Sequence, residues 1–502
     1  MLRPPRYLIS VLIAVSWAAV MGLLVYREII VPSLYAAPVV LAAEVPRDYW
    51  MSVSMGDTRV GFVHVRSDPE MRERVPGSRI NLTVRLALSL FGQNANLLLS
   101  GEAWRSSDNT AAVFDFDIAS GEHEMRIEGK LDDGTLDARL HTAGEETPFT
   151  FPVDSQLLFG GGMGAGAVDL PILEPGEEVY INSFDPTTMS MGKARIHCER
   201  IDTVPAAGEM VQARVYAVSM GGITTRAWVT EEQETVRAET PFGLLLTKTN
   251  PEEAMRPLEG GERASLVQSL SVQPKGLSAA VGLQRMRFRI SGLPEDLTLP
   301  EDEYQKKIEA GVYEITPPAT VEARTGAPLE GGEREALLAS DPLVTSDNPQ
   351  IVAAAGEAVR SADTDLERAM NLYRWVYDNI DKVPIISVPS ALDVLRTRQG
   401  DCNEHTVLFT AMARAAGVPC RIVIGLVYSD TLGGFGYHAW PEVYADGWLP
   451  MDPTLGQPIA DATHIKLLTG SIEKWTGLVN YIGRVEMEIL EADPGETHAE
   501  LP

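Results

Sequence analysis

Residues 399–409 read QGDCNEHTVLF, a glycine and an acid followed by a cysteine and then an apolar run. Asp401 is of a type preferred at helix N-caps, and Glu404 three positions later completes a capping-box pattern. Gly417 follows at a position typical of a left-handed C-cap. The stretch therefore predicts a helix that begins at Cys402.

A cysteine at the first position of a capped helix is typical of a nucleophile. The helix dipole and the unpaired backbone N–H groups favour the thiolate, so we expect the thiol pKa to lie below its free value of about 8.5. The alternative interpretation of Cys402 is a small residue buried at a helix start. The chain has three cysteines, which cannot all pair with one another. We interpret the other two, Cys198 and Cys420, as small buried residues.

A cysteine nucleophile needs a base, and His438 and Asp452 are the candidates. His438 lies 438 − 402 = 36 residues after Cys402, and Asp452 lies 452 − 438 = 14 residues after His438. In a Cys–His–Asp set of this order the histidine takes the thiol proton and the acid orients the imidazole. The residues therefore predict a site made of Cys402 as nucleophile, His438 as base and Asp452 as orienting acid.

The register of an expected hairpin decides whether this site can form. A two-residue turn would place His438 and Asp452 on opposite faces of the hairpin. A three-residue loop at 445–447 pairs Tyr444 with Trp448 and brings the two side chains to one face. We therefore predict the 444/448 pairing and a positive φ at Gly447, or failing that a one-residue bulge near Pro441.

Three stretches carry a resemblance: AxxVLxxxxGDCNEHxxLFxAxxRAxGVPCR at 391–421, YHAWPEVYADGWLPMDPT at 437–454 and GQPIADATHIKL at 456–467. Through them the chain resembles the transglutaminase-like (papain-like) superfamily, in particular bacterial exported proteins with a transglutaminase-like domain. The resemblance implies that Cys402 is the nucleophile, His438 the base and Asp452 the orienting acid. It also implies acyl transfer through a thioester that ends on water or on an amine.

Other residues near these motifs have two interpretations each. Trp440 is a substrate-binding residue that walls the channel, or a packed tryptophan of the hairpin. His405 is expected to be structural, while Asp461 and His464 either line the cleft or stabilise a turn. Arg396 stands where papain-type proteases use a glutamine, so the second oxyanion donor is left open.

The remaining sequence predicts an α+β fold with an N-terminal transmembrane helix, a large antiparallel β-domain and a C-terminal papain-like or transglutaminase-like α+β core. The β-domain is expected because short strand-like runs alternate with glycine-rich turn signals and no long helical pattern interrupts them. The predicted domains are a cytoplasmic tip with a transmembrane signal anchor at 1–30, the β-rich domain at 45–290, a connector at 291–345, the catalytic domain at 346–490 and an acidic disordered tail at 491–502.

The membrane helix is predicted from residues 7–26, a stretch of 26 − 7 + 1 = 20 residues without a charge. Such a stretch spans one hydrocarbon core of about 30 Å as a helix. Arg3 and Arg6 precede it, which places the N-terminus in the cytoplasm. We thus expect a single-pass protein of the bacterial inner membrane with a periplasmic catalytic domain; a cleaved signal peptide is the alternative.

Composition narrows the possible partners and functions. The net charge of −28 disfavours nucleic acid as a partner, because phosphate binding needs basic patches. The pattern predicts no cofactor and no metal. The function predicted is hydrolysis of peptide or amide bonds in a protein or peptide substrate of the cell envelope, with the membrane bound through the N-terminal helix. Amine transfer and a non-catalytic scaffold are the alternatives.

Overall fold

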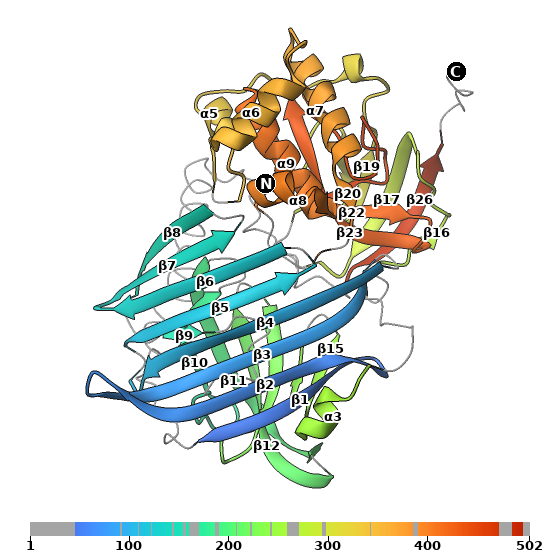
Figure 1. The fold of residues 1–502 in the computed structure, drawn as a ribbon. Coiled ribbons are helices and arrows are strands. Elements are labelled where there is room, and N and C mark those ends of the chain that lie inside the picture. The colour runs from blue at the N-terminus through green and yellow to red at the C-terminus, as the bar shows by residue number, and fades with distance from the viewer. Residues whose placement is uncertain are drawn as a thin grey trace, which may run out of the picture.

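The computed structural model describes residues 46–494, apart from 160–169, 259–270, 471–483 and shorter gaps. Its largest element is a sheet of fifteen strands, which fills the lower half of Figure 1. Its neighbouring strands are antiparallel, except that β9 and β10 are parallel. In spatial order the strands are β8 (Glu145–Pro152), β7 (Thr135–Thr142), β6 (His123–Asp132), β5 (Ala112–Ser120), β4 (Gln93–Ser106), β3 (Val75–Leu90), β2 (Thr58–Arg72), β1 (Arg47–Met55), β15 (Leu244–Thr249), β14 (Thr235–Glu239), β13 (Ile223–Val229), β12 (Glu209–Met220), β11 (Ser190–Ala206), β10 (Glu178–Asp185) and β9 (Leu157–Phe159).

The large sheet curls so that its apolar face encloses a core. Alternate residues of β1, such as Tyr49 and Met51, are buried, as expected for a strand with one face turned inward. Phe184 of β10 packs against Phe114 of β5 and Phe151 of β8, with ring centroids 5.7 and 6.0 Å apart. In Figure 1, β1–β8 accordingly lie in front of the strands β9–β15.

The second half of the chain combines helices with two smaller sheets and a two-stranded ladder. One sheet has five strands in the order β16-β26-β17-β19-β18, and the other has four in the order β24-β23-β22-β25. The strands are β16 (Lys275–Gly276), β17 (Arg285–Ser291), β18 (Gln305–Glu309), β19 (Val312–Ile315), β20 (Asp381–Lys382), β21 (Gln399–Gly400), β22 (Cys420–Ser429), β23 (Gly434–Tyr444), β24 (Trp448–Pro450), β25 (Ile465–Gly470) and β26 (Glu486–Asp493). The helices are α3 (Pro251–Met255), which lies beside β1, η2 (Val321–Ala323), α5 (Glu333–Leu338), α6 (Pro349–Ala358), α7 (Asp365–Asn379), α8 (Ala391–Thr397) and α9 (Cys402–Ala415).

Helix α9 is the centre of this second half. Eleven of its fourteen residues are buried, because it contacts β22 and β23 as well as the helices α6, α7 and α8. The apolar residues Val407, Leu408 and Met412 belong to the core that these elements share. Gly417 follows the helix with φ of 79°, which confirms the predicted left-handed residue at its C-terminal end.

The large sheet contacts the helical part close to the start of α9. The hydroxyl of Thr142 in β7 donates a hydrogen bond of 2.5 Å to the carboxylate of Asp393 in α8, and both side chains are buried. Leu343 packs against the core of the large sheet, and its carbonyl accepts a hydrogen bond from the N–H of Ala391 at the start of α8. The element that precedes α9 is therefore fixed against the sheet.

The predicted fold class, α+β with an N-terminal transmembrane helix, is wrong. The described chain is mostly β, because the fifteen-stranded sheet outweighs the mixed part that follows it. Among the described residues no helix is both long and apolar enough to cross a membrane. The predicted single-pass localisation in the inner membrane is corrected accordingly, since the structure does not support it. The segment 7–26, on which that prediction depended, lies outside the described residues.

Two further segments contribute strands to the five-stranded sheet. The predicted connector, 291–345, contributes the hairpin β18–β19 to the five-stranded sheet. Strand β26 pairs with β17 as far as Asp493, so it includes the first residues of the predicted disordered tail, 491–502. Among the described strands, β18 pairs only with the adjacent β19, while β19 and β26 each pair with β17.

Candidate active site

Cys402 is the first residue of α9, as the sequence predicts. The Asp401 carboxylate accepts the N–H of Asn403 at 2.9 Å, and the Glu404 carboxylate accepts the N–H of Asp401 at 2.8 Å, which forms the predicted capping box. Gly400 lies so close to this cap that a Cβ on it would fall 2.1 Å from the Cβ of Glu404. The sequence around Cys402 therefore fixes where the helix begins.

The thiol of Cys402 is buried, with 9% of the residue exposed. Burial raises its pKa well above the ordinary value, and the neighbouring Asp401 carboxylate acts in the same direction. The backbone N–H of Ala439 opposes this shift. The sequence predicts a thiol pKa below its free value, whereas burial of the Cys402 thiol raises it. A base is needed to form the thiolate.

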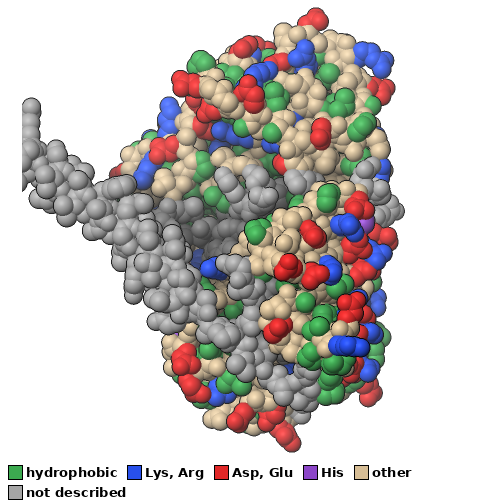
Figure 2. Space-filling view, turned by 90° about the vertical axis from the view of Figure 1, so that its left-hand side faces the viewer, with side chains coloured by type: hydrophobic (Ala, Val, Ile, Leu, Met, Phe, Trp, Pro, Cys, Tyr) green, Lys and Arg blue, Asp and Glu red, His purple; other side chains and the backbone are tan. Residues whose placement is uncertain are grey.

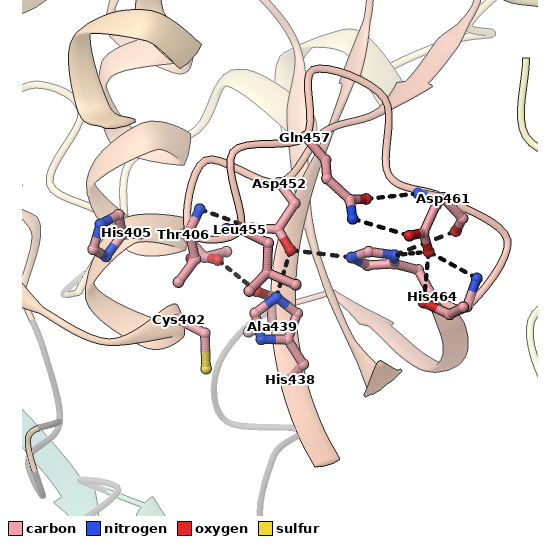
Figure 3. Close-up of polar contacts among 12 residues, drawn as sticks. Cys402, His405, Thr406, His438, Ala439, Asp452, Leu455, Gln457, Asp461 and His464 are labelled. Atoms are coloured by element: carbon pink, nitrogen blue, oxygen red, sulfur yellow. Dashed lines mark hydrogen bonds and ion pairs between the residues drawn. The ribbon is translucent and has the colours of Figure 1, made fainter. Parts of the chain in front are cut away.

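His438 is positioned as that base. It lies on β23, an inner strand of the four-stranded sheet, and Figure 3 shows its ring beside the thiol of Cys402, with Asp452 on the far side of the ring. Its Nε2 is 2.7 Å from Oδ2 of Asp452. Nδ1 is consequently the ring nitrogen left for the thiol. The structure thus brings all three predicted residues together.

Asp452 is held in a buried loop that follows β24. Its Oδ1 accepts the backbone N–H groups of Thr454 and Leu455, each at 2.8 Å. Burial alone would raise the pKa of Asp452, but His438 and His464 hold it well below its usual range. Asp452 is therefore a carboxylate whose Oδ1 accepts two backbone N–H groups and whose Oδ2 faces the ring nitrogens of His438 and His464.

The register that places Asp452 is the predicted one. Tyr444 pairs with Trp448 across the hairpin of β23 and β24, which leaves a three-residue loop. Gly447 has a positive φ of 150°, as predicted, and Asp446 takes the left-handed conformation with φ of 56°. The short strand β24 stops before Asp452, so the carboxylate reaches His438 from a loop rather than from a ladder position.

A second histidine extends the site beyond the predicted three residues. His464 Nε2 lies 3.0 Å from Oδ2 of Asp452, and its Nδ1 lies 3.2 Å from Oδ1 of Asp461. Burial lowers the pKa of His464, but its contacts with Asp452 and Asp461 outweigh this and raise it to about 9. The sequence signal for His464 is the segment ADATHI, which also contains Asp461. From the sequence, these two residues could either line the cleft or stabilise a turn.

Trp440, His405 and Arg396, the other residues considered from the sequence, lie around the site. Trp440 is fully buried, with its ring centroid 6.1 Å from His438 and 5.0 Å from His464, so it packs behind the site. His405 is buried and its Nδ1 lies 2.7 Å from the backbone oxygen of Asp401. Arg396 extends toward Gln350.

The other two cysteines take no part in the site. Cys198 and Cys420 are free and fully buried, and burial raises the pKa of Cys420 to about 12.

Among the described residues, one group offers atoms that a metal ion could use: His438, Asp452 and His464, with ligand atoms within 4.8 Å of one another. A metal would need the ring nitrogens as unprotonated ligands. Here both Nε2 atoms lie at hydrogen-bond distance from the same carboxylate oxygen, 2.7 and 3.0 Å. The arrangement fits a proton-bearing network better than a metal centre.

The sequence model of the Transglutaminase-like superfamily matches residues 352–453. The chain therefore carries a domain of this superfamily, whose members are typically cysteine proteases or acyltransferases. The matched range includes Cys402, His438 and Asp452, and it ends before His464.

Two curated relatives and one solved structure resemble the chain over part of its length. The kyphoscoliosis peptidase of Mus musculus is 33% identical over 132 residues, covering 22% of this chain and 19% of the relative. The one of Homo sapiens is 31% identical over 152 residues, covering 26% and 22%. In both cases the chain spans less than a quarter of the relative. The periplasmic domain of TgpA from Pseudomonas aeruginosa is 17% identical with a TM-score of 0.23, covering 36% of this chain and 98% of that chain.

Proposed function

We propose that the chain is a cysteine acyl-transfer enzyme that hydrolyses peptide or amide bonds in a protein or peptide substrate. The observation that carries the proposal is the meeting of Cys402, His438 and Asp452 in one buried group, drawn from α9, β23 and the loop after β24. His438 has its orienting acid at 2.7 Å, and the Cys402 thiol, which contacts Oδ1 of Asn403 at 3.9 Å, lies beside the His438 ring in Figure 3.

The first half of the reaction forms a thioester. His438 takes the Cys402 proton at Nδ1 while Sγ attacks the substrate carbonyl carbon, and the carbonyl oxygen becomes an oxyanion. The Asp401 cap uses the N–H groups of Asn403 and Glu404, and it does not use that of Cys402 itself. The N–H of Cys402 is therefore the donor at the helix start that stabilises the oxyanion. The C–N bond then breaks, and the leaving amine receives the proton from His438.

The second half of the reaction restores the thiol. His438, again neutral, takes a proton from water, and the resulting hydroxide equivalent attacks the thioester carbon. The C–S bond breaks, the acid product leaves, and Sγ regains the proton. Asp452 accepts from Nε2 throughout, which keeps Nδ1 directed at the reacting atoms and stabilises the imidazolium that forms in each half.

A peptide library incubated in H₂¹⁸O distinguishes the possible outcomes. Hydrolysis predicts new C-termini that carry one ¹⁸O, absent with the Cys402→Ala variant and counted by mass spectrometry. Adding a primary amine tests transfer in the same sample, because an amine adduct that depends on Cys402 would replace the ¹⁸O label. Products that are the same with and without Cys402, or no products at all, would contradict the proposal and favour a non-catalytic role.

A further inference from the structure

His464 lies between two carboxylates, and both of its ring nitrogens face only hydrogen-bond acceptors. Nε2 is 3.0 Å from Oδ2 of Asp452, while Nδ1 is 3.2 Å from both Oδ1 and the backbone oxygen of Asp461. A neutral imidazole has one nitrogen without a proton. In either tautomer that nitrogen would face an oxygen with nothing to donate. The contacts therefore favour a doubly protonated ring.

Neither carboxylate has a proton to give to His464. Asp461 accepts the N–H and the hydroxyl of Thr463 through Oδ1. Its Oδ2 accepts the N–H of Gly282 at 2.7 Å and the side-chain amide of Gln457 at 2.9 Å. Asp452 likewise accepts two backbone N–H groups through Oδ1, as described above. Because both acids act as acceptors, the two protons in these contacts belong to His464.

We propose that His464 is a positioning residue, held as an imidazolium between Asp452 and Asp461, that keeps the Asp452 carboxylate turned toward His438. The inference rests on the proposed function, since it concerns how the base of the same site is oriented. Among the described residues, the titratable groups that face His464 are Asp452 and Asp461 from the loop after β24 and His438 from β23. The ring centroids of the two histidines are 5.9 Å apart.

The loop itself does not need His464 to keep its shape. Asp452 and Gln457 exchange two backbone hydrogen bonds of 2.8 and 2.9 Å, and the Gln457 side chain binds Asp461 at both its carboxylate and its N–H. These bonds fix the backbone of Asp452. The N–H groups of Thr454 and Leu455 hold Oδ1 of its carboxylate, and His464 holds Oδ2, the oxygen that it shares with His438. His464 therefore acts on the carboxylate rather than on the loop.

The first test uses the complete protein labelled with [¹⁵N]histidine. NMR at pH 7 should show a buried histidine with both ring nitrogens protonated, and this signal should vanish in His464→Gln. The matched control is His64→Gln. It removes His64 of β2, which forms an exposed pair with Asp48 of β1, and should leave the signal unchanged. A neutral ring at His464 at pH 7 overturns the proposal, whether or not any variant folds.

The second test separates positioning from folding. His464→Gln should lower the rate at which iodoacetamide alkylates Cys402, and kcat of peptide hydrolysis, about 10- to 100-fold with KM unchanged, because the base is misplaced. A folded His464→Gln protein with wild-type rates would overturn the inference alone. A wild-type protein in which Cys402 is no more reactive than Cys198 and no peptide is hydrolysed would instead contradict the proposed function, while the NMR result still decides on His464.

Discussion

The large sheet and the helical half each contain a His–Asp pair, and the two pairs have nearly the same length. His64 and Asp48 on the sheet are 2.9 Å apart, and His438 and Asp452 are 2.7 Å apart. Their side chains differ in exposure, at 23% and 55% for the pair on the sheet but 5% and 0% for the other. A short contact alone therefore does not define a site. Exclusion of water, which strengthens electrostatic interactions, and an adjacent thiol distinguish the second pair.

The same contrast holds for the other charges of the two regions. Ion pairs on the sheet, such as Arg126–Asp115, lie on its exposed outer face, where salt and water weaken them. Figure 2 shows such acidic and basic side chains mixed over the visible surface. In the helical half, Lys466 of β25 contacts Glu442 of β23 and Asp302, and all three are largely or wholly buried. A buried charge that loses its partner is expected to destabilise the fold far more.

The largest expected effect separates the two His–Asp pairs. His438→Ala removes the base and should lower kcat/KM of peptide hydrolysis by roughly 10²- to 10⁴-fold. His64→Ala on the sheet should leave kcat/KM within about twofold, since exposed pairs contribute little. Kinetics of both variants on one peptide measure this. Equal losses in the two variants would remove the distinction between the pairs.

The next effect concerns stability. Lys466→Met removes one of the two cations that Glu442 and Asp302 share, the other being Arg421, and should lower the free energy of unfolding by about 3 kcal/mol. Arg126→Ala, which breaks the exposed pair with Asp115, should change it by less than about 1 kcal/mol. Urea titrations followed by circular dichroism give both values. A Lys466→Met protein as stable as Arg126→Ala would show that burial does not separate the two regions.

A pH effect should also belong to the helical half. The pKa of His464 is raised to about 9 from its ordinary value of 6.5, so its protonation stabilises the folded state fully below 6.5. This stabilisation is lost as the pH rises through about 9. The Tm of the wild-type protein should therefore fall more between pH 7 and pH 9.5 than that of His464→Gln. Parallel curves for the two proteins would contradict the raised pKa.

A smaller effect is expected at the hairpin that carries Asp452. Gly447 has φ of 150°, and a Cβ there would lie 3.1 Å from the backbone of Thr325. Gly447→Val should destabilise the protein by about 1–2 kcal/mol and lower kcat although it touches no reacting group. Gly433→Val is the control, because its φ of 59° is equally unsuited to valine but its Cβ would meet no atom within 4 Å. Activity that falls equally in both variants would contradict a specific effect on Asp452.

Local sequence was sufficient for those parts of the site that local interactions determine. The cap of α9 depends on Asp401 and Glu404, and the hairpin register depends on a loop of three residues, so both could be predicted. A proline inside a strand is typical of an edge or a bulge, yet β23, which contains Pro441, is an inner strand with regular pairing to β22. The last residue of β23 that pairs with β24 on this side is Glu442. Pro441 lies just beyond that pair, so the ladder with β24 does not require an N–H from it.

Properties that depend on distant segments were not visible in the sequence. The burial of Cys402, which reverses the expected direction of its pKa shift, results from packing of α9 against β23 and the neighbouring helices. The contact of His464 with Asp452 depends on how the loop between them folds back. The dominance of β-structure follows from the joining of fifteen strands into one sheet, which no single strand reveals.

The central claim is that Cys402 is a nucleophile activated by His438, and differential alkylation tests it most directly. The native protein is treated with limiting iodoacetamide at pH 7, and mass spectrometry follows Cys402, Cys198 and Cys420. Cys402 is 9% exposed and the other two cysteines are fully buried, so the comparison of the wild-type protein with His438→Ala separates activation of the thiol from its accessibility. The account predicts that Cys402 is alkylated well before the other two and that His438→Ala slows this reaction. Equal labelling of the three cysteines, or a rate at Cys402 that does not change in His438→Ala, would contradict it.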